Sequence, residues 1–128
     1  MPPGIDITTE AVRLALGVQQ LRAEYAAQNI ARANTPGAQA VRLDFNASQS
    51  LLTQAAAAPV GQDASVSAAL SVAADQLRPV EQLQAPGTPI QLDEEVANLA
   101  SANLDYQALS ESLSRHFGLM RLAITGKG

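Results

Sequence analysis

The chain lacks most of the residue types on which catalytic and metal sites depend. It contains no cysteine and one histidine, His116, so neither a thiolate site nor a pair of histidine ligands can form within it. The acidic triplet Asp93-Glu94-Glu95 is no substitute, because adjacent residues on a helix point in different directions. We therefore expect no enzyme, no cofactor and no metal site, and we interpret His116 as a surface or interface residue.

Large aromatic side chains are also scarce. There is no tryptophan, and two tyrosines and two phenylalanines account for the aromatic fraction of 3%. The apolar fraction is 47%, but much of it is alanine, which buries little area. Since aromatic side chains dominate the energetics of many cores, a core with so few of them is thin. The composition favours a chain that is completed by its neighbours.

Clustered positive charge and long apolar runs are missing as well. Eight basic residues face twelve acidic ones, for a net charge of -4, and the basic residues are scattered singly. Nucleic-acid binding and attraction to an anionic membrane both need clustered Lys and Arg, so we expect neither. No stretch approaches the roughly 20 apolar residues of a membrane-spanning helix, and residues 1–6 lack the basic and apolar regions of a secretory signal. Any export would therefore leave no cleaved signal peptide.

Two long helical patterns flank a weakly patterned middle, which divides the 128 residues into segments 1–36, 37–91 and 92–128. The first helix is predicted over residues 9–34, with Thr8 or Thr9 as its cap and Glu10 at its positive end. We expect it to stop within two residues of Asn34, because Pro36 disfavours helical geometry at the residue before it. Its apolar residues recur in steps of three and four, the spacing of a coiled-coil seam: Ala11, Leu14, Val18, Leu21 and Tyr25.

A turn and the weakly patterned middle follow. Pro36 and Gly37 suit the central positions of a type II turn. Residues 41–45 alternate apolar and charged, the pattern of a half-buried strand, and such a strand needs a partner. Alanine and glutamine favour a short helix over residues 47–57. Residues 46–76 nevertheless show no clean period, and our preferred interpretation of them is a loosely ordered or partner-dependent segment.

The second long helix is predicted to start at Asp93, with Asp93 as its cap, and to run to Ile124, shortly before Gly126. At about 1.5 Å per residue it would be close to 48 Å long, which indicates an elongated molecule. We expect a mainly α fold in which the two long helices form an antiparallel, coiled-coil-like pair, with the first seam facing the second. The second seam again runs in steps of three and four: Val96, Leu99, Asn103, Tyr106, Ser110, Leu113, Phe117, Met120 and Ile124. Within it, Asn103 either is neutral or fixes the register of the pair, as a buried seam asparagine can.

Both ends of the chain resemble one family. The run AQNIARANTPG at 27–37 resembles the signature near the N-terminus of bacterial flagellar rod and hook proteins, in which two asparagines, here Asn29 and Asn34, precede a Thr-Pro-Gly turn. The family usually has an aromatic residue directly after the glycine, where this chain has Ala38. Near the C-terminus, LDYQAL at 104–109, LSRHFGL at 113–119 and LAITG at 122–126 resemble one of the proximal-rod members of the family.

The resemblance implies a structural subunit of the flagellar basal-body rod. Such proteins pass through the flagellar export apparatus without signal cleavage and polymerise in the periplasm through their terminal helices. The implied partners are copies of the chain, other rod proteins, and basal-body components at the inner-membrane ring and the rod base. The residues expected to form assembly contacts are Leu14, Val18, Leu21, Tyr25, Asn29, Asn34, Pro36, Gly37, Val96, Leu99, Asn103, Tyr106, Leu113, Phe117 and Met120.

A second function fits the two seams equally well. A coiled-coil adaptor or chaperone of a secretion or motility apparatus would bind one partner helix at a time through the same kind of surface. The seams by themselves do not separate this function from polymerisation. Electron microscopy of the assembled protein would, because a polymer and a defined small complex differ in shape.

Overall fold

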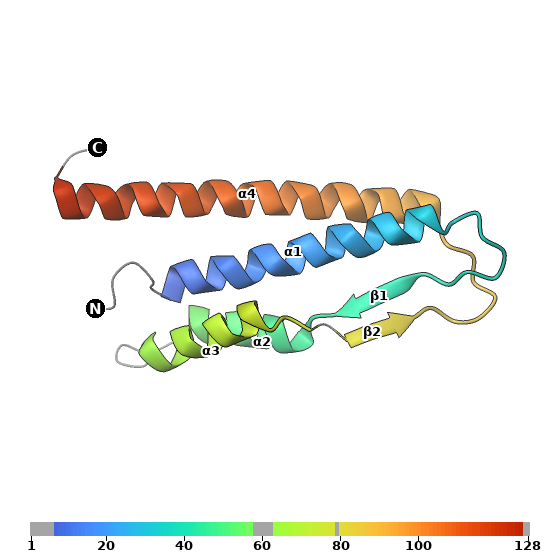
Figure 1. Cartoon of the computed structure of the whole chain (residues 1–128), viewed down its shortest axis with the longest axis horizontal. Coiled ribbons are helices and arrows are strands. Elements are labelled where there is room, and N and C mark those ends of the chain that lie inside the picture. Colours follow the sequence, from blue (N-terminus) through green and yellow to red (C-terminus); the bar gives the residue numbers. More distant parts are fainter. Residues whose placement is uncertain (1–6, 58–62, 79, 127–128) are drawn as a thin grey trace.

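The structure, a computed structural model, describes residues 7–57, 63–78 and 80–126 (Figure 1). Residues 1–6, for which we expect no secretory signal, lie outside this range. The elements are α1 (Ile7–Ala31), β1 (Val41–Asp44), α2 (Asn46–Ala56), α3 (Asp63–Asp75), β2 (Val80–Leu83) and α4 (Leu92–Thr125). The predicted mainly helical, elongated fold with a long helix at each end is confirmed.

The molecule is arranged in layers around α1. Helix α4 runs antiparallel to α1 along one side, and α2, α3 and the two strands lie on the other side (Figure 1). Within the described residues α4 packs along α1, and β1 reaches α4 through the Arg42 side chain, which forms ion pairs with Glu94 and Glu95. At its C-terminal end α4 continues past the start of α1 (Figure 1). One long face of α4 is therefore covered, and the rest of its circumference is not.

Helix α1 begins two residues earlier and ends earlier than predicted. It ends at Ala31, three residues before Asn34 and thus just outside the predicted margin. The N–H of Ala33 donates to the carbonyl of Ile30 at 3.1 Å, and the N–H of Thr35 to the carbonyl of Arg32 at 3.0 Å. These bonds to the third residue back tighten the chain from α-helix into turns, which moves the helix end away from the proline.

Two Pro-Gly turns lie at the end of the molecule where α1 ends and α4 begins (Figure 1). Gly37 has φ +77° and Gly87 has φ +86°, the left-handed region that the third position of a type II turn requires. The turns are closed by bonds from Ala38 N–H to the Thr35 carbonyl at 3.1 Å and from Thr88 N–H to the Ala85 carbonyl at 3.2 Å. The first turn was predicted, and the second was not.

The middle of the chain is more regular than predicted. Strand β1 pairs antiparallel with β2, with Val41 opposite Leu83 and Asp44 opposite Val80, so its partner comes from the same chain. Helices α2 and α3 occupy much of the segment that we interpreted as loosely ordered, and that interpretation is wrong for the described residues. Leu70 of α3 is fully buried. Alanine-rich helices give little amphipathic signal, but packing on α1 stabilises them.

The two ends of helix α4 are determined by backbone conformation and backbone hydrogen bonds rather than by capping side chains. Its cap residue is Gln91, with no side-chain hydrogen bond, so the prediction that Asp93 is the cap is wrong. Asp93 lies inside the first turn, where its charge still suits the helix dipole. At the other end Gly126 adopts φ 70°, and its N–H donates to the Leu122 carbonyl at 2.7 Å. This is the usual glycine stop of a helix.

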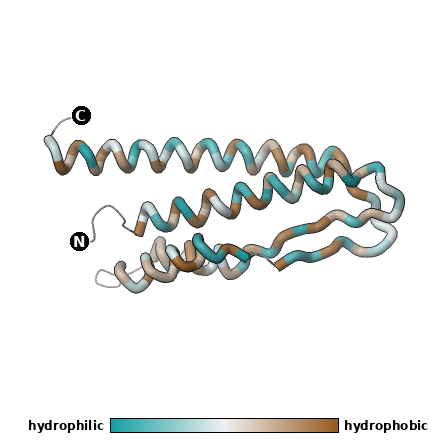
Figure 2. Tube along the Cα trace, viewed as in Figure 1, coloured by the Kyte–Doolittle hydropathy of each residue, from teal (hydrophilic) through white to brown (hydrophobic). Residues whose placement is uncertain are grey.

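The core is small and follows α1. Its buried apolar residues are mostly aliphatic and include several alanines: Leu14, Val18, Ala26, Ala40, Phe45, Leu70, Ile90 and Ala102. Figure 2 shows apolar residues recurring along the whole of α4, including the end beyond α1. No helix among the described residues is long and apolar enough to cross a membrane.

Candidate assembly surface and the cluster that orients it

A buried asparagine joins α1 to β1. The Asn29 side-chain Nδ2 donates to the Val41 carbonyl at 3.0 Å, and the Val41 N–H donates back to Asn29 Oδ1 at 3.0 Å. The amide thus pairs with both backbone groups of Val41, as a neighbouring strand would. Of the two asparagines in the 27–37 run, Asn29 makes this contact, whereas Asn34 is exposed.

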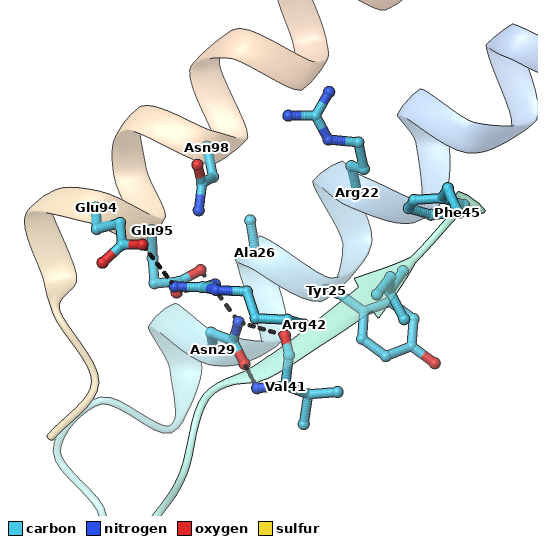
Figure 3. A pocket seen from close by; sticks show the side chains of 11 residues that line it. Arg22, Tyr25, Ala26, Asn29, Val41, Arg42, Phe45, Glu94, Glu95 and Asn98 are labelled. Carbon is cyan, nitrogen blue, oxygen red and sulfur yellow. Dashed lines mark hydrogen bonds and ion pairs between the residues drawn. The ribbon is translucent and has the colours of Figure 1, made fainter. Parts of the chain in front are cut away.

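The same asparagine reaches α4 (Figure 3). Its Nδ2 also lies 3.1 Å from Glu95 Oε2. Glu95 is fully buried, and its other oxygen forms an ion pair with one terminal nitrogen of Arg42 in β1. The other terminal nitrogen of Arg42 lies 3.0 Å from Glu94 Oε1. A buried carboxylate needs both charge and hydrogen-bond partners, and these residues supply them from two other elements. We call Asn29, Val41, Arg42 and Glu95 the polar clasp.

The clasp determines which face of α4 meets α1. Glu95 and Ala102 are the buried residues of α4, and Leu109 and His116 continue at the same seven-residue spacing and are half-buried. The predicted seam shares Leu99, Leu113 and Met120 with this face, and all three are half-buried. At the other positions of this face, the residue that meets α1 lies one position before the predicted seam residue. Glu95, for example, is buried where Val96 was expected to be. The alanine at 102, which is fully buried, allows the two helices to approach closely.

Of the remaining seam residues, Ser110 is half-buried and the others are left at the surface. Val96 is 50% exposed, Tyr106 39% and Phe117 41%, and Asn103 is exposed too. The expectation that these residues face α1 is therefore wrong for Val96, Asn103 and Phe117. They lie on one flank of the helix because they recur at helical spacing. We define the α4 stripe as the exposed apolar residues on this flank: Leu92, Val96, Tyr106, Phe117 and Ile124.

On α1 the predicted seam is only partly directed at α4. Leu14 and Val18 are buried, and Leu21 is half-buried. Tyr25 points the other way, since its hydroxyl hydrogen-bonds Glu81 of β2. That hydrogen bond, with smaller contributions from burial and the nearby negative charges, raises the pKa of Tyr25 above its ordinary value. Tyr25 thus joins α1 to the sheet rather than to α4.

Two further contacts hold the α2–α3 layer on α1, and sequence reasoning missed both. Arg13 forms ion pairs with the buried Glu10 at 2.9 Å and with Asp75 at the end of α3. A Cβ on Gly17 would lie 3.1 Å from the Leu77 side chain, so the absence of a side chain allows this close packing. The only sequence signal was a glycine inside a helical pattern, which weakens the helix unless packing requires it.

The exposed turn residues Asn34, Pro36 and Gly37 lie together at the tip of the molecule. They border a cavity of about 320 Å³ that is also lined by Gly87, Thr88, Pro89 and Ile90. Among the described residues no three His, Asp or Glu side chains gather so that they could hold a metal ion. Comparison of the chain with family models, curated proteins and solved structures found no match.

Proposed function

We propose that this chain is a structural subunit of the bacterial flagellar basal-body proximal rod and polymerises through its terminal helices into the drive shaft. Its resemblance to rod and hook proteins in residues 27–37 and 104–126 supports this role, as does the pair of long antiparallel helices. Its partners are then copies of itself, neighbouring rod proteins, basal-body components at the inner-membrane ring and rod base, and the export apparatus. Its location is the periplasmic part of the basal body.

The α4 stripe carries the proposal. A small protein seldom leaves several large apolar side chains exposed along one helix unless they contact a partner. In this chain the stripe extends from Leu92 to Ile124, nearly the whole of α4. A neighbouring subunit in a polymer would cover the stripe, whereas α1 covers only the adjacent face of α4. If the chain were a coiled-coil adaptor, one helix of its partner would cover the same stripe.

The test compares two aspartate variants of α4 in a strain without the native protein. Phe117→Asp adds a charge to the stripe, and Ala108→Asp adds the same charge at an exposed position on the opposite side of the helix. Phe117→Asp should be exported but should abolish rods in isolated basal bodies, because a charge buried at a subunit contact costs several kcal/mol. Ala108→Asp should assemble at a level closer to that of the parent.

The outcome tests whether the α4 stripe is a contact surface. Rods that are complete with Phe117→Asp would contradict the proposal. Electron microscopy of the purified parent distinguishes the rod subunit from the adaptor. Polymers favour the rod subunit, and a defined complex with one partner favours the adaptor.

A further inference from the structure

The two outer edges of the β1–β2 sheet differ. On the β1 edge, the Asn29 amide pairs with both the N–H and the carbonyl of Val41. A strand cannot add there without displacing Asn29, which is 1% exposed. On the other edge no strand lies beside β2 within the described residues, and the contact with α1 is made by a side chain, through the hydrogen bond between Glu81 and Tyr25. Strand β2 is also the element farthest from α4 at this end of the molecule (Figure 1).

The register shows which groups β2 presents at its free edge. In an antiparallel pair, residues alternate between pointing their N–H and carbonyl at the partner strand and pointing them away. The N–H of Gln84 donates to the carbonyl of Ala40 at 3.0 Å, and Val41, opposite Leu83, bonds Asn29 instead. By this alternation the backbone groups of Glu81 and Leu83 point outward.

The free edge also carries exposed apolar side chains. Val80 is 61% exposed and Leu83 is 65% exposed. Exposed edges are usually protected by proline, lysine or inward-pointing charge. Strand β2 has one charged residue, Glu81, and the Tyr25 hydroxyl already engages it. A two-stranded sheet is marginal by itself, and additional strands stabilise it.

We propose that the free edge of β2 pairs with β2 of a second copy of this chain, forming a four-stranded antiparallel sheet across a two-fold axis. Centring the axis on Gln82 pairs Glu81 with Leu83 of the second copy, and Leu83 with Glu81 of the second copy. Both outward-pointing residues of each strand then find a partner. No two carboxylates lie directly opposite each other, which a cross-strand pair would disfavour. The strand is in this sense complementary to itself.

This pairing goes beyond the proposed function and does not rest on it. A two-fold contact uses the same patch on both copies and closes on itself, whereas a rod needs contacts that continue. The dimer is therefore a state of the unassembled chain. The β1 edge cannot extend it, because Asn29 occupies that edge.

Two charge variants of Leu83 test the pairing in the full-length chain. Both remove the same apolar side chain, but Leu83→Glu sets a carboxylate opposite Glu81 of the second copy, and Leu83→Lys sets a cation there. Sedimentation equilibrium over a concentration series should show the parent and Leu83→Lys dimerising with constants within about threefold of each other. Leu83→Glu should dimerise about tenfold more weakly, since two symmetric cross-strand pairs are affected.

A cross-link gives a second measurement. The chain has no cysteine, so Gln82→Cys introduces a single thiol at the axis, where directly opposite residues lie about 4.5 Å apart in Cα positions. That separation suits a disulfide, and mild oxidation should give a covalent dimer. Gln107→Cys, on exposed α4, should cross-link much more slowly.

Three results would overturn the proposal. They are a parent that stays monomeric throughout the series, a dimer that both Leu83 variants weaken equally, and a Gln82→Cys cross-link no faster than that of Gln107→Cys. A dimer weakened equally by both variants would indicate general apolar contact rather than strand pairing.

Discussion

At the scale of single residues, the side-chain amide of Asn29 makes the backbone hydrogen bonds that a neighbouring strand would usually make. Asn29 satisfies both backbone groups of Val41 and also donates to a fully buried carboxylate. Its Oδ1 accepts in addition from Arg32 at 3.0 Å. Few other side chains supply donors and acceptors in this arrangement. A buried position that needs both explains why an asparagine lies one turn after the last residue of the apolar seam.

Replacing Asn29 should therefore be costly. Asn29→Ala leaves the Val41 groups without their partner and removes a donor from Glu95, and each buried group left unsatisfied costs about 1–3 kcal/mol. The free energy of unfolding, from urea titration followed by circular dichroism, should fall by at least that amount. Asn34→Ala is the matched control, because Asn34 is exposed and should change the free energy by no more than about 0.5 kcal/mol. Equal effects of the two variants would contradict the role of the clasp.

Tyr25 predicts a pH dependence. Its phenol donates to the Glu81 carboxylate, which raises the pKa of Tyr25. A raised pKa means that folding favours the protonated phenol. The resulting stabilisation is complete below the unfolded pKa of about 10, and it is lost as pH rises through the higher pKa of the folded chain.

Absorbance at alkaline pH measures this directly. In a Tyr106→Phe background Tyr25 is the only tyrosine, and its ionisation can be followed without overlap. Glu81→Gln should lower the pKa of Tyr25 toward its ordinary value, because both the acceptor charge and its repulsion of the phenolate are removed. Identical titration curves with and without Glu81 would show that the contact is absent in solution.

At the scale of elements, turns rather than side-chain caps determine where the helices end. Helix α1 passes into tight turns before Pro36. Helix α4 follows the second Pro-Gly turn and ends at Gly126. Two turns with the same residue pair return the chain at the tip, one leading into β1 and the other leading out of β2. The direction of both strands therefore depends on the left-handed glycines.

Gly37→Val tests whether the first turn aims the strand or only stops the helix. The space around Gly37 is open, so the cost comes from its positive φ, about 1 kcal/mol or more for a branched residue. We expect β1 to be misdirected; on the proposed rod function, rods should then fail although export continues. Export and rod formation are scored separately in a strain without the native protein.

Gly118→Ala is the control for a glycine without a special conformation. Gly118 lies inside α4 with open space around it, so alanine should stabilise the helix by up to about 1 kcal/mol and leave assembly intact. Complete rods with Gly37→Val would reduce the turn to a simple helix stop.

At the scale of the whole molecule, α1 is shared between two layers and α4 is not. One flank of α1 meets α4, and the opposite flank meets the layer formed by α2, α3 and the sheet. The predicted seam of α1 is therefore divided between the two layers, and Tyr25 is directed to β2. Helix α4 packs along α1, meets β1 only through the Arg42 side chain, and extends past the start of α1 (Figure 1). The unburied part of its apolar surface is thus available for contacts between molecules.

The sequence by itself determined the two long helices, a strand at 41–45, of which the structure has 41–44, and the first Pro-Gly turn. Each of these depends on local physics: apolar spacing along a helix, alternation along a strand, and the restricted φ of proline. The same local rules favoured a helix near 47–57, but they gave no period for α3, because alanine-rich helices owe their stability to what they pack against.

Only the tertiary structure decided the partner of β1, the rotation of α4 and the positions of the buried polar residues. An apolar stripe wider than one contact face does not specify which flank is covered, so Val96 and Phe117 were assigned to the wrong side. The choice is made by the polar clasp, in which Glu95 must meet Arg42 and Asn29 from distant parts of the sequence. A buried carboxylate is stable only where such partners converge, and convergence is a property of the fold that no local pattern contains.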